Sequence, residues 1–250
     1  MPKFAEDATL EDHQIGHFGF SAVSLDELES TGYTLATLVC DRSGSTGGFQ
    51  HEMEAAIKAS VNALKKHPQA DSIMLRLIAF GSTVEEVHGF ILLSDIDDLS
   101  KYDGVLAPEG MTALFDACVN AAEASANYGK QLMQDRFNAN GIMICITDGM
   151  NNIGKFSQDA DVVHVKKAFD QTRLSESLES FVTILIAVNS SYAGGELKTF
   201  HAGAGFTQDM IELADASEAT IAKIGQFVSE SISSTSQSLG SGGPSTSLSF

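Results

Sequence analysis

Residues 34–48, with the sequence TLATLVCDRSGSTGG, decide the fold class. The first seven residues are almost all apolar or β-branched, which is typical of a strand covered on both faces of a parallel sheet. The last eight are polar and glycine-rich, and an amphipathic stretch of helical length, residues 49–66, follows them. A buried strand, a polar turn and a helix in this order predict an α/β protein.

The rest of the chain repeats this pattern. Further strands are predicted at residues 73–80, 142–147 and 181–188, and further helices at residues 112–134, 160–175 and 218–233. Residues 83–93 follow the second strand after only two residues, which is hairpin spacing and predicts an antiparallel edge strand. A short last strand is expected within residues 206–213. The expected fold is a Rossmann-like three-layer α/β sandwich, in which helices flank a central, mostly parallel sheet with one antiparallel edge strand.

Length and composition predict one large domain. The chain has 250 residues, of which 43% are hydrophobic, enough to build a sizeable core. We assign the domain to residues 31–235 and residues 1–30 to an N-terminal extension. Residues 236–250 are mostly Ser, Gly and Thr, a composition typical of a flexible tail.

The charge of the chain disfavours several classes of partner. Its 33 Asp and Glu against 15 Lys and Arg give a formal net charge of −18, and the basic residues are scattered. Nucleic acid and anionic membrane surfaces both need a basic face, so neither is expected as a partner. Three cysteines lie in apolar runs, where reduced thiols behave as small hydrophobes. With no apolar signal segment and no run of about 18 apolar residues, the chain is expected to be cytoplasmic.

Oxygen-bearing side chains follow two of the predicted strands. Asp41, Ser43 and Ser45 come after the first strand, Asp148 comes after the strand at residues 142–147, and Thr112 stands near the start of a predicted helix. The carboxyl ends of parallel strands share one edge of the sheet, so we expect these five side chains to converge there. The alternative, in which they only cap a helix and stabilise a turn, would not require three segments to meet.

This set of side chains predicts a magnesium site. Two carboxylates and three hydroxyls, without Cys or His, suit a hard cation, and they fit octahedral Mg²⁺ better than the carbonyl-rich shell of Ca²⁺. A position left open in the shell could take a carboxylate from a partner. Because an acidic surface repels an acidic ligand unless a cation bridges them, such binding should be lost in chelator.

The pattern Asp41-x-Ser43-x-Ser45, with Thr112 and Asp148, resembles the metal-ion-dependent adhesion site of the von Willebrand factor A family. The similarity covers roughly residues 33–233, and all five motif positions are filled. The resemblance implies that Ser43, Ser45 and Thr112 contact the metal through their hydroxyls, and that both aspartates bind it directly or through water. It also implies a bound Mg²⁺, with Mn²⁺ or Ca²⁺ as substitutes, and protein binding without enzymatic activity.

The resemblance also implies the kind of partner, which should be a protein presenting Asp or Glu. Intracellular, stand-alone members of the family are often linked to AAA+ ATPases of the MoxR type, so an adaptor or regulator role is expected. Arg42 occupies a variable motif position and is expected to point to solvent, because an inward Arg would repel Mg²⁺; an ion pair with Asp148 or an exposed acid is the alternative. The partner-binding rim is expected at Arg42, Met111, Gly149 and Met150.

Two other functions stay open. A metal-dependent hydrolase such as a phosphatase could use the same ion as a Lewis acid. Such enzymes usually carry a second carboxylate two residues after the first, where this chain has Ser43, and the motifs contain no general base. The third hypothesis is a structural component of a virion or another assembly, in which the Ser- and Gly-rich tail would link copies. The patterns of serine hydrolases and P-loops are not matched.

Overall fold

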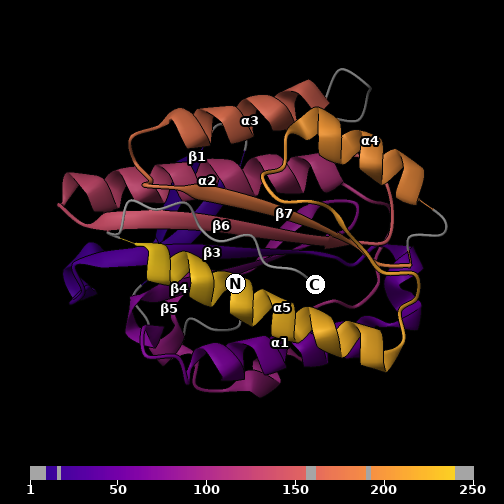
Figure 1. Ribbon diagram of the computed structural model, residues 1–250, viewed down its shortest axis with the longest axis horizontal. Helices are drawn as coiled ribbons and strands as arrows, with labels where there is room; N and C mark the ends of the chain where they lie inside the picture. Colours follow the sequence, from indigo (N-terminus) through magenta and orange to yellow (C-terminus); the bar gives the residue numbers. More distant parts are fainter. Residues whose placement is uncertain (1–9, 16–17, 156–161, 190–192, 240–250) are drawn as a thin grey trace.

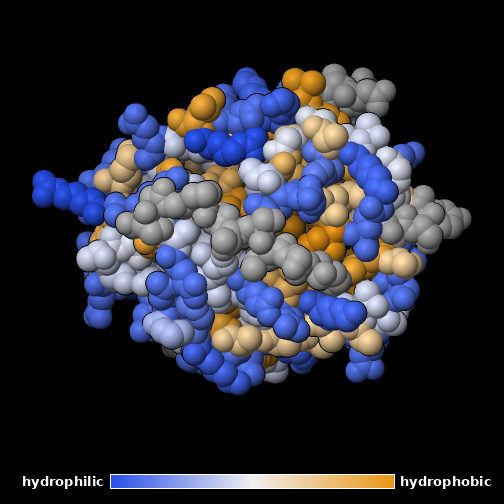
Figure 2. Space-filling view, in the orientation of Figure 1, coloured by the Kyte–Doolittle hydropathy of each residue, from blue (hydrophilic) through white to orange (hydrophobic). Residues whose placement is uncertain are grey.

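The molecule is built in three layers, as predicted. The computed structural model of the chain describes residues 10–15, 18–155, 162–189 and 193–239. One face of the central sheet is covered by α2 (Leu114–Gln134), α3 (Val162–Leu174) and α4 (Gly194–Ala204), and the other by α1 (Gln50–Leu64) and α5 (Glu218–Ser238) (Figure 1). Hydrophilic residues dominate the face shown in Figure 2, with smaller hydrophobic areas between them.

Eight strands form the sheet. They are β1 (Leu10–Ile15), β2 (Phe18–Val23), β3 (Gly32–Asp41), β4 (Ile73–Phe80), β5 (Val84–Leu92), β6 (Asn138–Thr147), β7 (Phe181–Ala187) and β8 (Ile211–Glu212). Their order is β1-β2-β5-β4-β3-β6-β7-β8. Neighbours from β4 to β8 pair in parallel, which confirms the mostly parallel sheet.

The hairpin of β4 and β5 is antiparallel, as the short spacing predicts. Its second strand is not at the edge, however. Strand β2 pairs in parallel with β5, and β1 pairs antiparallel with β2, so the antiparallel edge strand is β1. Strands β1 and β2 lie within the predicted N-terminal extension, residues 1–30, and they continue the sheet of the domain.

The central strands are buried along their whole length, because helices cover both of their faces. All residues of β3, β4 and β7 are buried. Alternate side chains of β3 face the two helical layers, with Leu38 packing in the cluster of α1 and α5 and Val39 in that of α2 to α4. This two-sided burial explains the nearly continuous apolar runs in the sequence.

Cys40, Cys118 and Cys145 are buried free thiols, as predicted from their apolar surroundings. None of the helices in the described ranges has the length and apolar character to cross a membrane.

Two helices differ from the prediction. Helix α4 was not expected, since its first residues, Gly194 and Gly195, disfavour helix. Helix α5 continues to Ser238, so the predicted tail begins inside it; Asn140 Nδ2 donates to the backbone oxygen of Thr235 at 3.0 Å and anchors this last turn to β6. Residues 240–250 of that tail lie outside the described residues.

A buried charged cluster joins β2 to the sheet. Arg76 on β4 is fully buried, and its Nε donates to Glu86 Oε2 on β5 at 2.7 Å. The other oxygen of Glu86 accepts hydrogen bonds from the backbone nitrogen and hydroxyl of Ser21 on β2, at 2.9 and 2.7 Å. Arg76 Nη2 also donates to Asn120 Oδ1 on α2 at 2.9 Å. The carboxylate of Glu86 is therefore the common partner of β2 and of the buried guanidinium.

Candidate metal-binding site

Two neighbouring strand ends carry the carboxylates of the predicted motif. Asp41 is the last residue of β3, and Asp148 directly follows the last residue of β6. These strands pair in parallel, with Cys40 opposite Ile146, so they end side by side at one edge of the sheet. The short 3-10 helix η2 (Gly44–Gly48) begins three residues after Asp41.

A chain of hydrogen bonds links four of the five motif residues. Asp41 Oδ1 accepts from the backbone nitrogen of Ser43 at 2.7 Å. The hydroxyls of Ser43 and Ser45 lie 3.1 Å apart, and the Ser45 hydroxyl donates to Asp148 Oδ1 at 2.7 Å. Side chains from the end of β3, from η2 and from the residue after β6 thus lie close together, and their binding of a metal stays a prediction.

The fifth residue, Thr112, is held against the same edge by backbone hydrogen bonds. Its backbone nitrogen donates to Asn152 Oδ1 at 2.7 Å, and its carbonyl accepts from the Asn152 nitrogen at 3.0 Å. On the other side, the Gly44 nitrogen donates to the Gly110 carbonyl at 3.1 Å. Gly110 has a φ of +64°, a left-handed conformation that glycine adopts without strain. Thr112 is buried and faces the pocket that contains Ser45 and Asp148.

Burial makes both carboxylates costly to ionise. It raises the pKa of Asp41 to about 6, although hydrogen bonds from Thr147 and Ser43 act in the opposite direction. Burial raises the pKa of Asp148 as well. A divalent cation between them would favour the ionised forms, since opposite charge lowers carboxyl pKa values.

The donor set fits Mg²⁺. Across the residues that the structure describes, no three His, Cys, Asp or Glu side chains gather closely enough to hold a metal on their own. The motif instead offers two carboxylates and three hydroxyls, and the Ser45 hydroxyl contacts both the Ser43 hydroxyl and the Asp148 carboxylate. Neutral hydroxyls with a few carboxylates leave room for the water molecules that Mg²⁺ usually retains.

A pocket of about 560 Å³ opens over this edge. Its lining combines motif residues with residues of the following loop and of α4: Ser45, Thr112, Asp148, Gly149, Met150, Asn151, Asn152, Asn189, Ala193 and Glu196. Of the predicted rim residues, Gly149 and Met150 line the pocket, and Met111 is 46% exposed beside Thr112. Their contact with a partner stays a prediction.

Arg42 does not point to solvent, in contrast to the first expectation. Its side chain is only 12% exposed, and Nη2 lies 2.6 Å from Glu85 Oε2 and 3.2 Å from Glu109 Oε2. The backbone carbonyl of Arg42 also accepts from the Glu109 nitrogen at 2.7 Å. The alternative pairing with exposed acids is therefore the observed one, and it draws the guanidinium to the loop that carries Thr112.

We expect the ion pair between Arg42 and Glu85 to have a coupling energy of about 1 kcal/mol, because its cation is mostly desolvated while its anion is not. The test is a double-mutant cycle with Arg42→Ala and Glu85→Ala in urea denaturation. Lys166 and Asp170, an exposed pair on α3, provide the control, with about 0.3–0.5 kcal/mol expected. Equal coupling in the two cycles would contradict this role of Arg42.

Several residues of the site were missed by the sequence analysis. Thr147 donates its hydroxyl to Asp41 Oδ2 at 2.5 Å, and Asn151 Oδ1 accepts from the Phe115 nitrogen at 2.9 Å. Asn151 and Asn152 follow Asp148 within four residues in the sequence, and this closeness is the signal that could have indicated them. Asn189 and Glu196 follow β7, in a region where no helix was expected.

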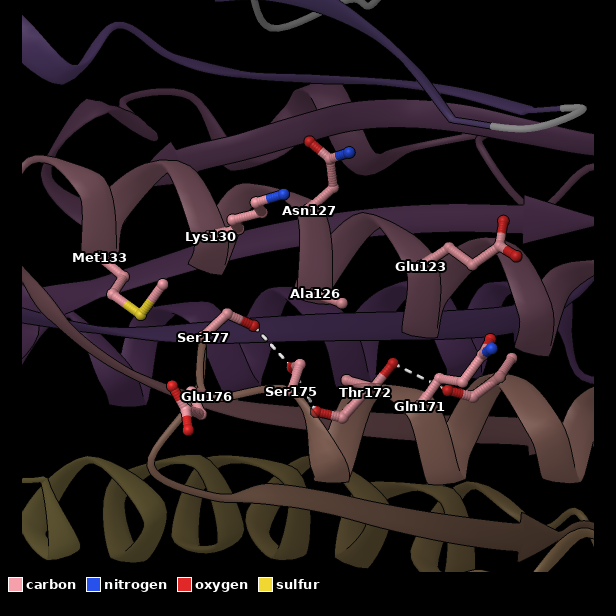
Figure 3. A pocket seen from close by; sticks show the side chains of 11 residues that line it. Glu123, Ala126, Asn127, Lys130, Met133, Gln171, Thr172, Ser175, Glu176 and Ser177 are labelled. Atoms are coloured by element: carbon pink, nitrogen blue, oxygen red, sulfur yellow. Dashed lines mark hydrogen bonds between the residues drawn. The ribbon is translucent and has the colours of Figure 1, made fainter.

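A second pocket, of about 470 Å³, lies between α2 and α3 (Figure 3). It shares no residue with the motif. Ser175 and Ser177 hydrogen-bond to each other at one end, with Oγ atoms 2.7 Å apart, and Met133 lies beyond them. Its two carboxylates, Glu123 and Glu176, lie on opposite sides of the pocket in Figure 3, so they do not form a pair like Asp41 and Asp148.

The sequence matches no protein-family model and none of the curated proteins. Many solved structures are similar, however. The PilB minor pilin from Streptococcus sanguinis is 12% identical, with a TM-score of 0.60, over 90% of this chain and 66% of that one. A von Willebrand factor type A protein from Catenulispora acidiphila is 14% identical, with a TM-score of 0.57, over 86% and 44% of the two chains. The chain has a von Willebrand factor A-like fold.

A third similar structure comes from the mussel byssus. Proximal thread matrix protein 1 from the mussel byssus, with a zinc-occupied metal-ion-dependent adhesion motif, is 20% identical, with a TM-score of 0.51. The match covers 80% of this chain and 46% of that one. The chain thus spans less than two thirds of the length of these structures, and at these identities the similarity establishes the von Willebrand factor A-like fold alone.

Proposed function

We propose that this von Willebrand factor A-like domain is a non-enzymatic binding module that holds Mg²⁺ and grips a carboxylate of a protein partner through it. Asp41, Ser43, Ser45, Thr112 and Asp148 would hold the ion, with Mn²⁺ or Ca²⁺ as substitutes. The ion would act as a Lewis acid toward the partner's Asp or Glu. The observation that carries the proposal is the hydrogen-bonded chain from Asp41 through Ser43 and Ser45 to Asp148, which opens into a pocket.

The acidity of the chain favours binding of an acidic ligand through a bridging metal rather than directly. With a net charge of −18, the surface repels acidic ligands unless a cation stands between them. We further propose a cytoplasmic protein whose partner is a AAA+ ATPase of the MoxR type. The support for this partner is the resemblance of the motif and its surroundings to stand-alone intracellular members of the family.

The test is a selection from a library of random displayed peptides, captured by the wild-type protein in Mg²⁺ and eluted with chelator. Enrichment of peptides that contain Asp or Glu is the expected result, and Asp41→Ala should capture none above background. Enriched peptides without acidic residues, or peptides retained in chelator, would contradict the proposal.

A metal-dependent hydrolase is the second candidate, since Glu196 places one more carboxylate in the pocket and such a group could serve as a general base. An assay of phosphate monoester hydrolysis in Mg²⁺ separates the two. Turnover that Glu196→Gln abolishes would favour the hydrolase, and its absence favours the binding module.

A further inference from the structure

The pocket beside the motif is also lined by residues that are not predicted metal ligands. Asn152, Asn189 and Glu196 line the pocket without belonging to the motif, and Glu196 lies in the first turn of α4. Among the described residues that line the pocket, none is basic. Within the described part of the chain, the exposed Glu196 carboxylate has neither an ion pair nor a hydrogen bond, so it faces the pocket as a free negative charge.

The amide of Asn152 has a fixed direction. Its Oδ1 accepts from the Thr112 nitrogen at 2.7 Å, and its own backbone nitrogen donates to the Thr112 carbonyl at 3.0 Å. With the oxygen committed, the Nδ2 group remains as a donor at the pocket wall. The pocket therefore offers an oriented amide donor next to the motif residue Thr112, and a carboxylate from α4.

The charges in the Mg²⁺-bound site would then favour one class of ligand. A Mg²⁺ ion offsets the charges of Asp41 and Asp148, so a partner carboxylate on the ion and Glu196 would remain as two like charges in one pocket. At the short distances inside such a pocket this repulsion is not fully screened. A cation carried by the same ligand removes it.

We infer that the partner segment is bifunctional: its acidic residue binds the metal, and a Lys or Arg close to it in sequence pairs with Glu196. This inference rests on the proposed function and names the chemistry of its partner. A pocket of 560 Å³ is roughly 10 Å across, and an extended chain advances about 3.3–3.6 Å per residue, so the basic residue lies within about three positions of the acidic one.

The peptide selection described above tests the inference when it is repeated with two charge-reversed variants. The wild type should enrich Lys or Arg within three positions of the acidic residue. Glu196→Lys should keep the acidic residue and lose the basic preference. Glu176→Lys makes the same charge change at an exposed residue just after α3, and it should select as the wild type does.

Two defined peptides give the magnitude. We compare an Asp-Gly-Lys with an Asp-Gly-Gln peptide, both blocked at their ends, in saturating Mg²⁺. The wild type should bind the Lys peptide roughly two- to fivefold more tightly, as expected for one partly exposed ion pair, and Glu196→Gln should bind the two equally.

The outcomes distinguish a failure of the inference from a failure of the proposed function. Acidic peptides without any basic preference, or equal binding of the two defined peptides by the wild type, overturn the inference and leave the metal-bridged module intact. The absence of Mg²⁺-dependent acidic peptides overturns the module, and the inference falls with it.

Discussion

Glu86→Ala is expected to lower the free energy of unfolding by about 3–5 kcal/mol, the cost of leaving a buried charge without its partner. Arg76 is fully buried, and Glu86 is the carboxylate that pairs with its Nε at 2.7 Å. The same carboxylate accepts both hydrogen bonds from Ser21, so β2 loses its polar anchor to β5 in the same variant. Such a loss is a large part of the stability of a typical domain.

Chemical denaturation of wild type and variant measures this effect. Glu11→Ala, an exposed glutamate on the neighbouring strand β1, is the control, with a change within about 0.5 kcal/mol expected. The double variant Arg76→Met, Glu86→Leu should lose less stability than Glu86→Ala, because it leaves no unpaired charge in the core. If the double variant were less stable than the single one, the unpaired charge would not be the cause.

Asp41→Asn is expected to stabilise the metal-free protein at pH 7 by roughly 1–3 kcal/mol while removing all stabilisation by Mg²⁺. Burial raises the pKa of Asp41 to about 6, so the folded state binds its proton more tightly than the unfolded state does. This group therefore favours folding at low pH, and its contribution is lost as the pH rises from about 4 through about 6. Asparagine keeps the shape of the side chain without the buried charge.

Unfolding curves at pH 4.5 and pH 7, with and without Mg²⁺, test both the stabilisation of the metal-free protein and the loss of stabilisation by Mg²⁺. The stability gap between the variant and the metal-free wild type should be larger at pH 7. The wild type, unlike Asp41→Asn, should gain stability from Mg²⁺, about 2.7 kcal/mol at a hundredfold excess over the dissociation constant. Asp26→Asn, at an exposed carboxylate, should match the wild type throughout. Equal Mg²⁺ stabilisation of Asp41→Asn and wild type would remove Asp41 from the metal site.

The fold could be predicted where local sequence pattern and tertiary burial agree. Strand β4 begins and ends where its apolar run does, and the centres of β3, β6 and β7 were identified in the same way. Strand β1 was not, because its sequence LEDHQI has only two apolar residues and depends on pairing with β2. The cluster of Arg76 and Glu86 that docks β2 joins residues far apart in sequence, and no local pattern indicates it.

Part of the site could also be predicted from the sequence. Convergence of the motif could be expected, because parallel strands β3 and β6 end at one edge, and the structure brings Asp41, Ser43, Ser45 and Asp148 into hydrogen-bonded contact. The direction of Arg42 could not, since it depends on Glu85 across the β4–β5 hairpin. Glu196 was missed with α4, whose two leading glycines disfavour the helix that tertiary packing stabilises.

Calorimetric titration of Mg²⁺ into the wild type, Asp41→Ala and Thr112→Val tests the central claim most directly. One site per chain in the wild type, no binding by Asp41→Ala and weakened binding by Thr112→Val are the predicted results. A wild type that takes up no Mg²⁺, or an Asp41→Ala protein that binds it equally well, would show that these residues do not form the metal site.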